Sequence, residues 1–493
     1  SVVSNERFLD IVRHLAFTVK DGVSRSVDFR NLGSEELGSV YEGLLALTPK
    51  IEGGGHRFLF EELSGNQRKT SGSYYTPDSL VRQLLETALE PVVQERLQHK
   101  ELAEQEQAIL GMAVCDPAAG SGHFLVGAAH YLAERLGGIR ARLAGEDDPT
   151  PELYQQALRD VIAHCIYGVD MNPMAVELCK VTLWMESMEP GRPLGFLEHH
   201  IRLGNSLVGA PKDAYAIGIP DGAFKGLEGD DKTALKELKK LNRQRSRKSV
   251  STGLFEGQPE SVTDLRAPFS ALEQMPDDSL ASIADKHRAY EQLRSSDAFQ
   301  EEKRILDAWT AAFFVPKSVE LNPLRYHGIT NDHLDVLAGK KSPSPNLAVD
   351  EEAIESWTAE LRFFHWHLEF PLVMERGGFD VMLGNPPWER VKIQRVEWFA
   401  QRLPSINAVS TSAKRKAAIA ELEVSSPAIF AAFKQDEALA LAISGFLRHS
   451  GLYPLGGCGD VNYANVFAEL FLRRIGDSGL FGAVLPSGVC TGD

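Results

Sequence analysis

Residues 112–124 read Met-Ala-Val-Cys-Asp-Pro-Ala-Ala-Gly-Ser-Gly-His-Phe, and this stretch decides the fold class of the chain. Its first four residues form a short apolar run typical of a buried strand, and apolar residues recur at helical spacing from 124 to 136. The two glycines between them permit a tight turn and a close approach of the backbone to a ligand. A strand, a glycine-rich turn and a helix in this order indicate the first unit of a parallel sheet with a ligand site at its carboxyl edge.

The same alternation continues along the chain. A strand is predicted at 165–169 with a helix at 174–188, a third strand end at 201–207, and later strands at 379–383 and 479–485. Strands that alternate with helices favour a mostly parallel sheet covered by helices on both faces. The predicted fold class is therefore α/β with a Rossmann-like sheet.

The pattern divides the chain into four parts. Residues 1–65 show helical periodicity, first at Phe8, Ile11, Val12 and Leu15 and then at Leu37, Val40, Tyr41, Leu44 and Leu45, and predict an N-terminal helical segment. Residues 66–211 form the first part of the sheet domain and 361–493 its second part. Between them, 212–360 are polar, charged and poor in β-branched residues, which predicts a mainly helical insertion.

Charge and cysteine content restrict the function classes. The 493 residues carry a formal net charge of −16, which opposes general attraction to nucleic acid but leaves room for local basic surfaces. Three basic clusters stand out, at 68–69, 239–248 and 414–416; most such runs are solvated helix faces. The five scattered cysteines show no metal-ligand spacing, so we expect no metal site and a reducing, cytoplasmic location. We also find no apolar run long enough for a membrane span.

The glycine-rich turn indicates a ligand that carries an ammonium and a carboxylate. The third glycine of the dinucleotide fingerprint is missing, because Gly120 and Gly122 are followed by Phe124 and Leu125. Asp116 at the strand end would repel a pyrophosphate but attract an ammonium, while the helix N-terminus favours a carboxylate. The methionine part of S-adenosylmethionine fits this turn better than a nicotinamide dinucleotide.

Two further strand ends carry candidate ligand-binding side chains. Asp170 ends the second predicted strand, where a carboxylate can hold both hydroxyls of a ribose; alternatively, Asp170 or Asn172 caps the next helix. Asn205 follows the third strand in the string Gly-Asn-Ser-Leu, and its amide can bond an adenine edge or form an Asx turn. Both alternatives remain open from the sequence.

The string Asn385-Pro386-Pro387-Trp388 directly follows the predicted strand 379–383. Two prolines stiffen the loop and donate no backbone hydrogen bond. The Asn385 side-chain oxygen and the Pro386 carbonyl then present two fixed acceptors, which suit the two protons of an exocyclic amine. Trp388 can stack on the ring that carries this amine. The alternative, a proline-stiffened turn with a core tryptophan, is disfavoured by the position of this string after a strand of a cofactor-binding sheet.

These strings, in this order, resemble the adenine-specific N6 DNA methyltransferases that depend on S-adenosylmethionine. Residues 72–77, Gly-Ser-Tyr-Tyr-Thr-Pro, resemble the N-terminal cofactor motif of that family, with Thr76 as an N-cap and Pro77 in the first helical turn. The motif order resembles the gamma arrangement, and flanking strings at 32–41, 364–371, 460–467 and 484–488 also agree. The chain looks like the large methylases of type IIG restriction–modification enzymes and of BREX or DISARM phage-defence systems.

The resemblance implies a role for each matching residue. The methionine end of the cofactor would be held by Tyr75, Thr76, Asp116, Ala118, Gly120, Gly122 and Phe124. Asp170, with Met171 beside it, would bind the ribose, and Asn205 the adenine of the cofactor. Asn385, Pro386 and Pro387 would form the catalytic loop, and Trp388, which stands where tyrosine or phenylalanine is commoner, would stack on a flipped adenine.

The implied reaction is direct methyl transfer to the N6 amine of adenine in double-stranded DNA, within a restriction or defence complex. Two alternatives remain: a cofactor-binding subunit of a defence complex with little activity alone, or a methyltransferase for RNA or protein glutamine. The chain begins with Ser1, and residues 485–493 look like a strand and turn that run onward. We therefore expect one piece of a longer polypeptide, with the target-recognition region beyond Asp493.

Overall fold

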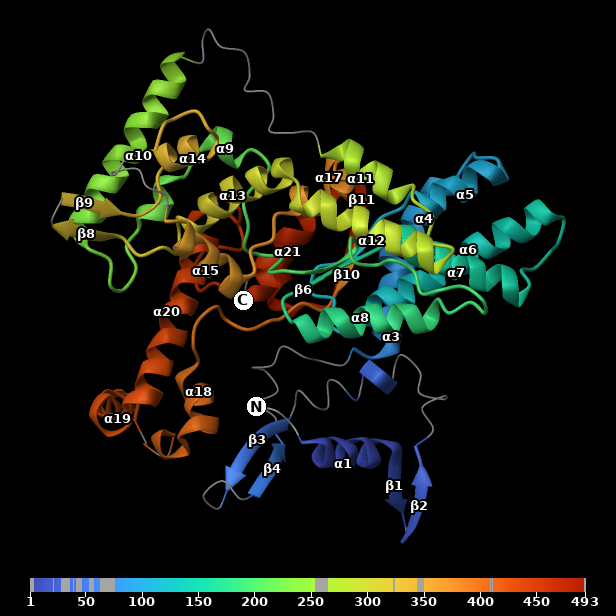
Figure 1. Cartoon of the computed structure of the whole chain (residues 1–493), viewed down its shortest axis with the longest axis horizontal. Helices are drawn as coiled ribbons and strands as arrows, with labels where there is room; N and C mark the ends of the chain where they lie inside the picture. Colours follow the sequence, from blue (N-terminus) through green and yellow to red (C-terminus); the bar gives the residue numbers. More distant parts are fainter. Residues whose placement is uncertain are drawn as a thin grey trace.

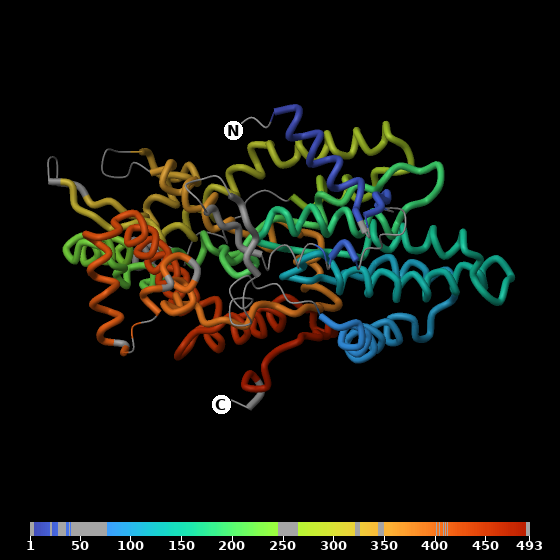
Figure 2. The backbone as a smooth tube through the Cα atoms, turned by 90° about the horizontal axis from the view of Figure 1, so that it is seen from below, coloured from blue at the N-terminus to red at the C-terminus, as the bar shows by residue number. Residues whose placement is uncertain are grey.

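The computed structural model describes residues 4–20, 22–27, 36–38, 40, 47–52, 57–62, 76–252, 265–321, 324–343, 350–407, 409 and 411–491. Figures 1 and 2 both show the helices of residues 90–164 at one end of an elongated molecule, and α10 with the β8–β9 hairpin at the other. None of the helices in the described ranges is long and apolar enough to cross a membrane.

A five-stranded parallel sheet lies at the centre, with strand order β11-β10-β5-β6-β7. Its strands are β5 (Val114–Asp116), β6 (Ile166–Asp170), β7 (Ile201–Leu203), β10 (Phe379–Gly384) and β11 (Ile475–Ala483). The chain builds β5, β6 and β7 in one direction and then returns to add β10 and β11 on the other side of β5. The strand order therefore reverses between β5 and β10, and such a reversal opens a ligand crevice at the carboxyl ends of the strands.

The alternation of side chains along the strands creates two separate cores. Val114, Ile166 and Val381 belong to the core on one face, whereas their sequence neighbours Cys115 and Met382 belong to the core on the other face. This period of two is what a parallel sheet covered on both faces requires. The predicted α/β class with helices on both faces is confirmed.

The first face is covered by residues that surround β5 and β6 in sequence. A nearly continuous helix comprises α3 (Asp78–Leu84), the π-helical turn η4 (Leu85–Leu89) and α4 (Glu90–Leu97). It is followed by α5 (Leu102–Leu110), α6 (His123–Ala144), α7 (Pro151–His164) and α8 (Pro173–Glu186). Their apolar side chains fill one core of almost entirely buried residues.

The second face is covered largely from the segment predicted as an insertion. This segment contains α9 (Ala214–Ile217), η5 (Asp221–Phe224), α10 (Lys232–Thr252), α11 (Arg266–Glu273), α12 (Leu280–Ser295), α13 (Asp297–Ala311), β8 (Ser318–Leu321), β9 (Leu324–His327), α14 (Asn331–Leu337) and α15 (Glu351–Leu361). Trp309 and Phe314 are buried in the same cluster as Tyr167 and Phe379 of the sheet. The described residues between 212 and 360 thus contribute to a core that they share with the sheet.

Aromatic rings join this core to the strands. Tyr167 on β6 packs edge-on against Phe370 at 5.4 Å and against Phe379 at 5.5 Å between ring centroids. Phe370 lies between the short helices α16 (Trp366–Glu369) and α17 (Pro371–Glu375), which directly precede β10. The buried rings therefore fix the start of the strand that leads to Asn385.

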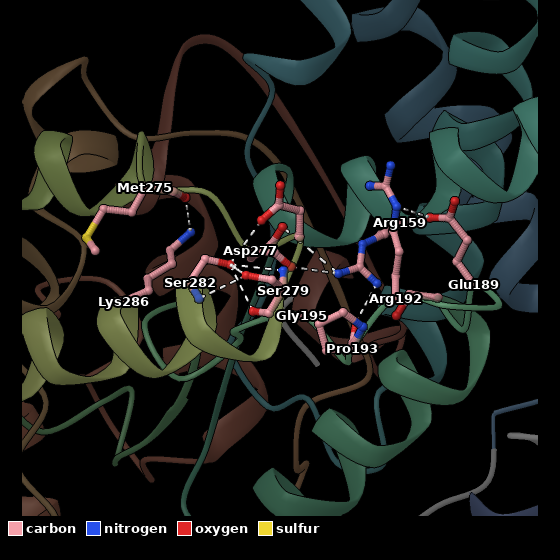
Figure 3. A network of polar contacts seen from close by, with 12 residues as sticks. Arg159, Glu189, Arg192, Pro193, Gly195, Met275, Asp277, Ser279, Ser282 and Lys286 are labelled. Carbon is pink, nitrogen blue, oxygen red and sulfur yellow. Dashed lines mark hydrogen bonds and ion pairs between the residues drawn. The ribbon is translucent and has the colours of Figure 1, made fainter.

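A buried arginine also links the helices on the two faces of the sheet through hydrogen bonds (Figure 3). Arg159 on α7 donates to the carbonyl of Pro193 at 2.7 Å and to that of Asp277 at 3.0 Å. Asp277 lies just before α12, whose N-cap Ser279 forms a capping box with Ser282. Since Arg159 is buried, these bonds also satisfy a charge that would otherwise be costly to remove from water.

Residues 395–449 form a helical outcrop that projects from the body of the molecule in Figure 1. It consists of α18 (Arg395–Arg402), η7 (Pro404–Ile406), α19 (Ser412–Ser425) and the long α20 (Pro427–His449). A small core of its own, which includes Trp398, Phe399 and Phe433, holds these helices together. The chain then returns through α21 (Tyr463–Arg474) to β11 and the short α22 (Gly488–Thr491).

The N-terminal prediction was only partly right. The helix α1 (Asn5–Ala16) carries the first predicted apolar set, and all four of its members are exposed. Two antiparallel hairpins follow, β1 (Phe17–Lys20) with β2 (Val23–Ser26), and β3 (Leu47–Glu52) with β4 (Arg57–Glu62). Between them, residues 36–38 and 40 are helical, and these include Leu37 and Val40 of the second predicted set. Strand residues such as Thr, Val, Ile and Phe alternate there, a period that the helical interpretation overlooked. Of the second predicted set, Tyr41, Leu44 and Leu45 lie outside the described residues.

Candidate active site

Four predicted site residues lie at the carboxyl ends of four adjacent strands. Asp116 ends β5, Asp170 ends β6, Asn205 follows β7 by two residues, and Asn385 directly follows β10. The sheet register places β5 between β6 and β10, so Asp116 is central. Parallel strands bring residues far apart in sequence to one edge, here on both sides of the strand-order reversal.

The glycine-rich turn after β5 adopts the conformation that its sequence predicts. Gly120 and Gly122 have φ of 54° and 89°, in the region that side chains other than glycine rarely adopt. A Cβ on Gly122 would also lie 2.8 Å from the Cys179 Sγ atom on α8. Two backbone bonds fix the turn: Ala119 donates to Val169 on β6 at 3.0 Å, and Gly122 donates to Ala119 at 2.8 Å.

Asp170 holds the glycine-rich turn through its carboxylate. One carboxylate oxygen accepts from the Gly120 N–H at 2.9 Å, and the other accepts from the Asn172 N–H at 2.7 Å. Burial raises the pKa of Asp170, while these N–H groups lower it. Asn172, not Asp170, caps α8, because its side chain accepts from Met174 at 3.0 Å. The helix-cap alternative for Asp170 is therefore excluded, and its ribose contact stays a prediction.

Asp116 is a buried carboxyl group beside the catalytic strand. Its Oδ1 accepts from the Ala118 N–H at 2.9 Å, and a Cβ on Gly384 of β10 would lie 2.8 Å from the same oxygen. Burial raises the pKa of Asp116 to about 8; the Ala118 N–H lowers it, and the charge of Asp170 raises it further. Without a cation nearby, Asp116 is thus mostly protonated at neutral pH. A ligand ammonium would favour the carboxylate.

Asn385 presents one bonded and one unbonded end of its amide. Its Nδ2 donates to the Thr76 hydroxyl oxygen at 3.1 Å, which fixes the orientation of the amide. Its Oδ1 is buried and has no hydrogen-bond partner among the described residues. Leaving such an acceptor unpaired costs about 1–3 kcal/mol. Pro386 next to it is also buried, so the loop holds an unpaired acceptor in a rigid backbone.

Trp388 lies at the mouth of this loop. The side chain is 40% exposed, and its Nε1 donates to the Val484 carbonyl, just after β11, at 3.1 Å. Val484 in turn donates to the Gly384 carbonyl at 3.0 Å. The indole is thus anchored at its polar edge, and this geometry disagrees with a core tryptophan. A flat, partly exposed ring is suited to stacking on a base.

The remaining predicted cofactor residues differ in their surroundings. The Phe124 side chain is packed in the core under α6, which leaves only its backbone amide for a ligand. Met171 is 47% exposed beside Asp170, and its carbonyl accepts from Arg362. The Asn205 Oδ1 accepts from the Leu207 N–H at 3.1 Å, which is the Asx turn foreseen as an alternative. Tyr75 lies outside the described residues.

The prediction that Thr76 is an N-cap is wrong, and the structure instead shows a contact with Asn385. The helix α3 begins at Asp78, and Pro77 occupies the cap position without a side-chain bond. The Thr76 hydroxyl, in a residue that is 6% exposed, instead accepts from Asn385. The predicted Thr-Pro motif identified the residue, but no local signal pointed to a contact 309 positions away.

Among the described residues, one cluster has the geometry to hold a metal ion: His199, His200 and Glu273. The Glu273 carboxylate lies 3.2 Å from His199 Nε2 and 2.9 Å from His200 Nε2. Burial lowers the pKa of His199 to about 3, which keeps this ring neutral. Metal-bound histidines usually donate their second N–H, yet both Nδ1 atoms lack a partner in the described part of the chain. The cluster precedes β7, at the opposite edge from Asn385, and plays no part in the candidate active site.

The parallel sheet, the strand-order reversal and the loops at its carboxyl edge define a Rossmann-like methyltransferase fold. The chain belongs to the Eco57I restriction-modification methylase family, whose model matches residues 164–422, more than half of the chain. The N-6 DNA methylase family model matches residues 51–212. Together these matches include Asp116, Asp170, Asn205 and Asn385.

Two curated relatives extend this result. The chain is 26% identical to a putative type II restriction enzyme and methyltransferase of Methanocaldococcus jannaschii, over 77% of this chain and 33% of the relative. It is 29% identical to the adenine-specific methyltransferase PglX of Streptomyces coelicolor, over 43% of this chain and 16% of the relative. The matched part thus spans about a third or less of each relative.

Proposed function

We propose that the chain carries the catalytic core of a DNA methyltransferase that transfers a methyl group from S-adenosylmethionine to the N6 amine of adenine. The observation that carries this proposal is the Asn385 side-chain oxygen, a buried acceptor without a partner among the described residues. Membership in the Eco57I restriction-modification methylase family supports the reaction class.

The cofactor would be held by the edge formed by β5, β6 and β7. Asp116 would accept the cofactor ammonium, the N–H groups at the start of α6 would face its carboxylate, and Asp170 would bind the ribose. The buried acid next to Gly384 fits such a ligand, because its carboxylate gains a partner when a cationic donor arrives. S-adenosylmethionine supplies a methyl group bound to a positively charged sulfur.

The base would be held by the loop after β10. The Asn385 Oδ1 and the Pro386 carbonyl would accept hydrogen bonds from the two N6–H groups, and this keeps the nitrogen lone pair directed toward the cofactor. After the transfer, the positively charged N6 would lose one proton to solvent. Trp388 would stack on the flipped adenine. The loop therefore acts by positioning and by fixed acceptors, without a covalent enzyme intermediate. Since the Asn385 oxygen is shielded from solvent, the loop must open locally when the base enters.

The setting of the reaction is part of the proposal. The printed names of the two relatives, a restriction enzyme with methyltransferase and an adenine-specific methyltransferase, support a role in restriction–modification or phage defence. Double-stranded DNA is the proposed substrate, and further subunits of a defence complex are proposed partners. The free thiols of Cys115, Cys165 and Cys179 suit a reducing cytoplasm.

The test compares Asn385→Ala with Asn407→Ala. Asn407, in the helical outcrop, also has a bonded Nδ2 and a buried Oδ1 without a described partner, so it controls for loss of an amide. We expect Asn385→Ala to lower the rate of N6-methyladenine formation by a factor of about 10²–10³ while calorimetry finds the affinity for S-adenosylhomocysteine within a few-fold of wild type. Asn407→Ala should methylate normally. Methylation by Asn385→Ala at the wild-type rate would overturn the assignment, and cofactor binding by a wild-type protein that never methylates would favour the cofactor-binding-subunit alternative.

A further inference from the structure

A groove in the helical outcrop lies close in sequence to the candidate catalytic loop. It has a volume of about 610 Å³ and is lined by residues that include Lys392, Arg395, Arg415, Lys416 and Glu437. These come from the segment after Trp388, from α18, from α19 and from α20. We call it the basic groove.

The charge around the basic groove is opposite to that of the whole chain. Residues 389–416 contain seven Lys or Arg and two Glu, although the formal net charge of the chain is −16. One of the three basic clusters noted in the sequence, Lys414 to Lys416, falls within this segment and begins α19. A local positive surface on an acidic protein is suited to attract a polyanion to one place only.

Part of this charge lacks an internal counterion. Arg395 pairs with Glu437 at 2.9 Å, and Lys392 pairs with Asp460 at 2.8 Å. Within the described ranges, neither Lys414 nor Lys416 forms an ion pair with a carboxylate, and both are exposed. The Arg415 Nε is buried without a described partner, while its Nη2 donates to the Val409 carbonyl at 3.1 Å. The groove thus retains Lys416 as an exposed donor for an external acceptor, and Lys414 lies just outside the lining on the same helix.

The described cations of a second basic cluster, on α10, are paired with carboxylates. On α10, Arg243 and Lys239 both contact Asp221, and Lys240 lies 3.4 Å from Glu237. These cations are already partnered by the protein, so they have less to gain from a phosphate. The α10 cluster serves as the matched control for the basic groove.

The Lys392 edge of the basic groove is held close to the loop. Val391 donates to Val461 at 2.8 Å, and Tyr463 donates to Glu389 at 2.8 Å, so the segment after Trp388 is held against residues 461–463. Lys392 follows Trp388 by four residues, which span at most about 14 Å. That reach corresponds to about four base-pair rises of 3.4 Å.

We propose that the basic groove binds the phosphate backbone of duplex DNA, with its Lys392 edge within about four base pairs of the flipped adenine. This inference rests on the proposed function, because it places a substrate contact next to the same catalytic loop. Contacts of this kind carry no sequence information but position the duplex. They would supply part of the DNA affinity from within this chain, apart from any target-recognition region.

The experiment uses a fluorescent duplex and measures binding by anisotropy over a range of salt concentrations, together with N6-methyladenine formation. Lys414→Gln/Lys416→Gln removes two exposed cations, whose loss should not disturb folding. If both contact phosphates, the slope of log affinity against log salt falls by about 1.8, and affinity near 0.1 M salt falls about tenfold or more. The KM for DNA rises in parallel, while kcat at saturating DNA and the affinity for S-adenosylhomocysteine stay unchanged.

Two further variants distinguish phosphate binding at the basic groove from a general effect of surface charge. Glu437→Gln releases Arg395, while Lys434 keeps its ion pair with Glu228, and the variant should tighten DNA binding. Lys239→Gln/Lys240→Gln on α10 should leave the DNA affinity unchanged. An unchanged salt slope in the Lys414→Gln/Lys416→Gln protein overturns the groove assignment while leaving methylation intact. DNA binding that depends on the groove, in a protein that forms no N6-methyladenine, contradicts the proposed function instead.

Discussion

The cofactor side and the base side of the candidate site are built in different ways. On the cofactor side, the carboxylates of Asp170 and Asp116 accept N–H groups from the glycine-rich turn and its neighbours. On the base side, the Asn385 Nδ2 donates a hydrogen bond to Thr76, whereas the Asn385 Oδ1 has no partner among the described residues. The first half is held together by its own hydrogen bonds, whereas the second keeps an acceptor ready for a donor from outside. Mutations should therefore divide into those that affect cofactor affinity and those that affect turnover.

The largest effect is expected for Asn385→Ala. Removal of one preorganised polar group at a reacting centre typically lowers kcat by a factor of about 10²–10³. Because Asn385 lies on the base side, the affinity for S-adenosylhomocysteine should change only a few-fold. Single-turnover kinetics measure the methylation rate, and calorimetry on the same protein measures the affinity for S-adenosylhomocysteine. An equally large loss of cofactor affinity would contradict the division of the site into a cofactor side and a base side.

Asp170→Ala should produce the largest effect on the cofactor side. The variant loses the acceptor for the Gly120 and Asn172 N–H groups as well as the proposed ribose contact. Since hydrogen bonds to charged groups contribute about 1.5–3 kcal/mol, we expect cofactor affinity to fall at least about tenfold. Asn172→Ala is the control: it removes the cap of α8, costs about 1 kcal/mol of stability and should spare the affinity. Unchanged affinity in Asp170→Ala would limit this residue to a local structural role.

Trp388→Ala tests the stacking contact on the base side. Stacking of a base on an aromatic ring contributes about 1–3 kcal/mol, so the KM for DNA should rise about fivefold or more. Trp388→Phe keeps a stacking face but loses the bond to the Val484 carbonyl, and we expect an intermediate value. Steady-state kinetics with a fixed duplex distinguish the two variants. Equal kinetics for wild type and Trp388→Ala would remove Trp388 from the base pocket.

The raised pKa of Asp116 predicts a pH dependence of cofactor binding. In the ligand-free protein the carboxyl group titrates at about 8, and a bound ammonium stabilises the charged form. Binding below that pH must release a proton, so affinity should increase with pH, by at most about tenfold per unit, and level off above about 8. Calorimetry in two buffers of different ionisation enthalpy measures the proton release directly. Asp116→Asn should abolish the release; if it persists there, another group is responsible.

The smallest predicted effect belongs to Thr76, a positioning residue. Thr76→Val removes the acceptor for Asn385 Nδ2, a hydrogen bond that contributes about 0.5–1.5 kcal/mol. We expect kcat to fall about two- to tenfold with the KM for DNA nearly constant, and Thr76→Ser to restore the rate. A matching loss in Thr76→Ser, or an effect confined to KM, would show that Thr76 only fills space.

Much of the fold could be predicted because its strands are buried on both faces. Continuous apolar runs identified β5, β6 and β10 to within two residues at each end, and the glycine turn and the loop after β10 were visible as strings. The N-terminal hairpins were missed, because the helical period of residues 8–15 and 37–45 was extended to the whole of residues 1–65. Contacts between distant segments could not be predicted either. Nothing near Thr76 indicates its hydrogen bond with Asn385, and nothing in 212–360 indicates that Trp309 shares a core with the sheet.

The central claim is that the Asn385 loop directs methyl transfer to the N6 amine of adenine. The most direct test incubates the wild-type protein with duplex DNA and S-adenosylmethionine carrying an isotopically labelled methyl group, then digests the DNA and identifies the labelled nucleoside by mass spectrometry. We expect label in N6-methyladenine alone, and at least about a hundredfold less label in the same reaction time when Asn385 is replaced by Ala. Label in a methylated cytosine, or equal label in the Asn385→Ala reaction, would contradict it.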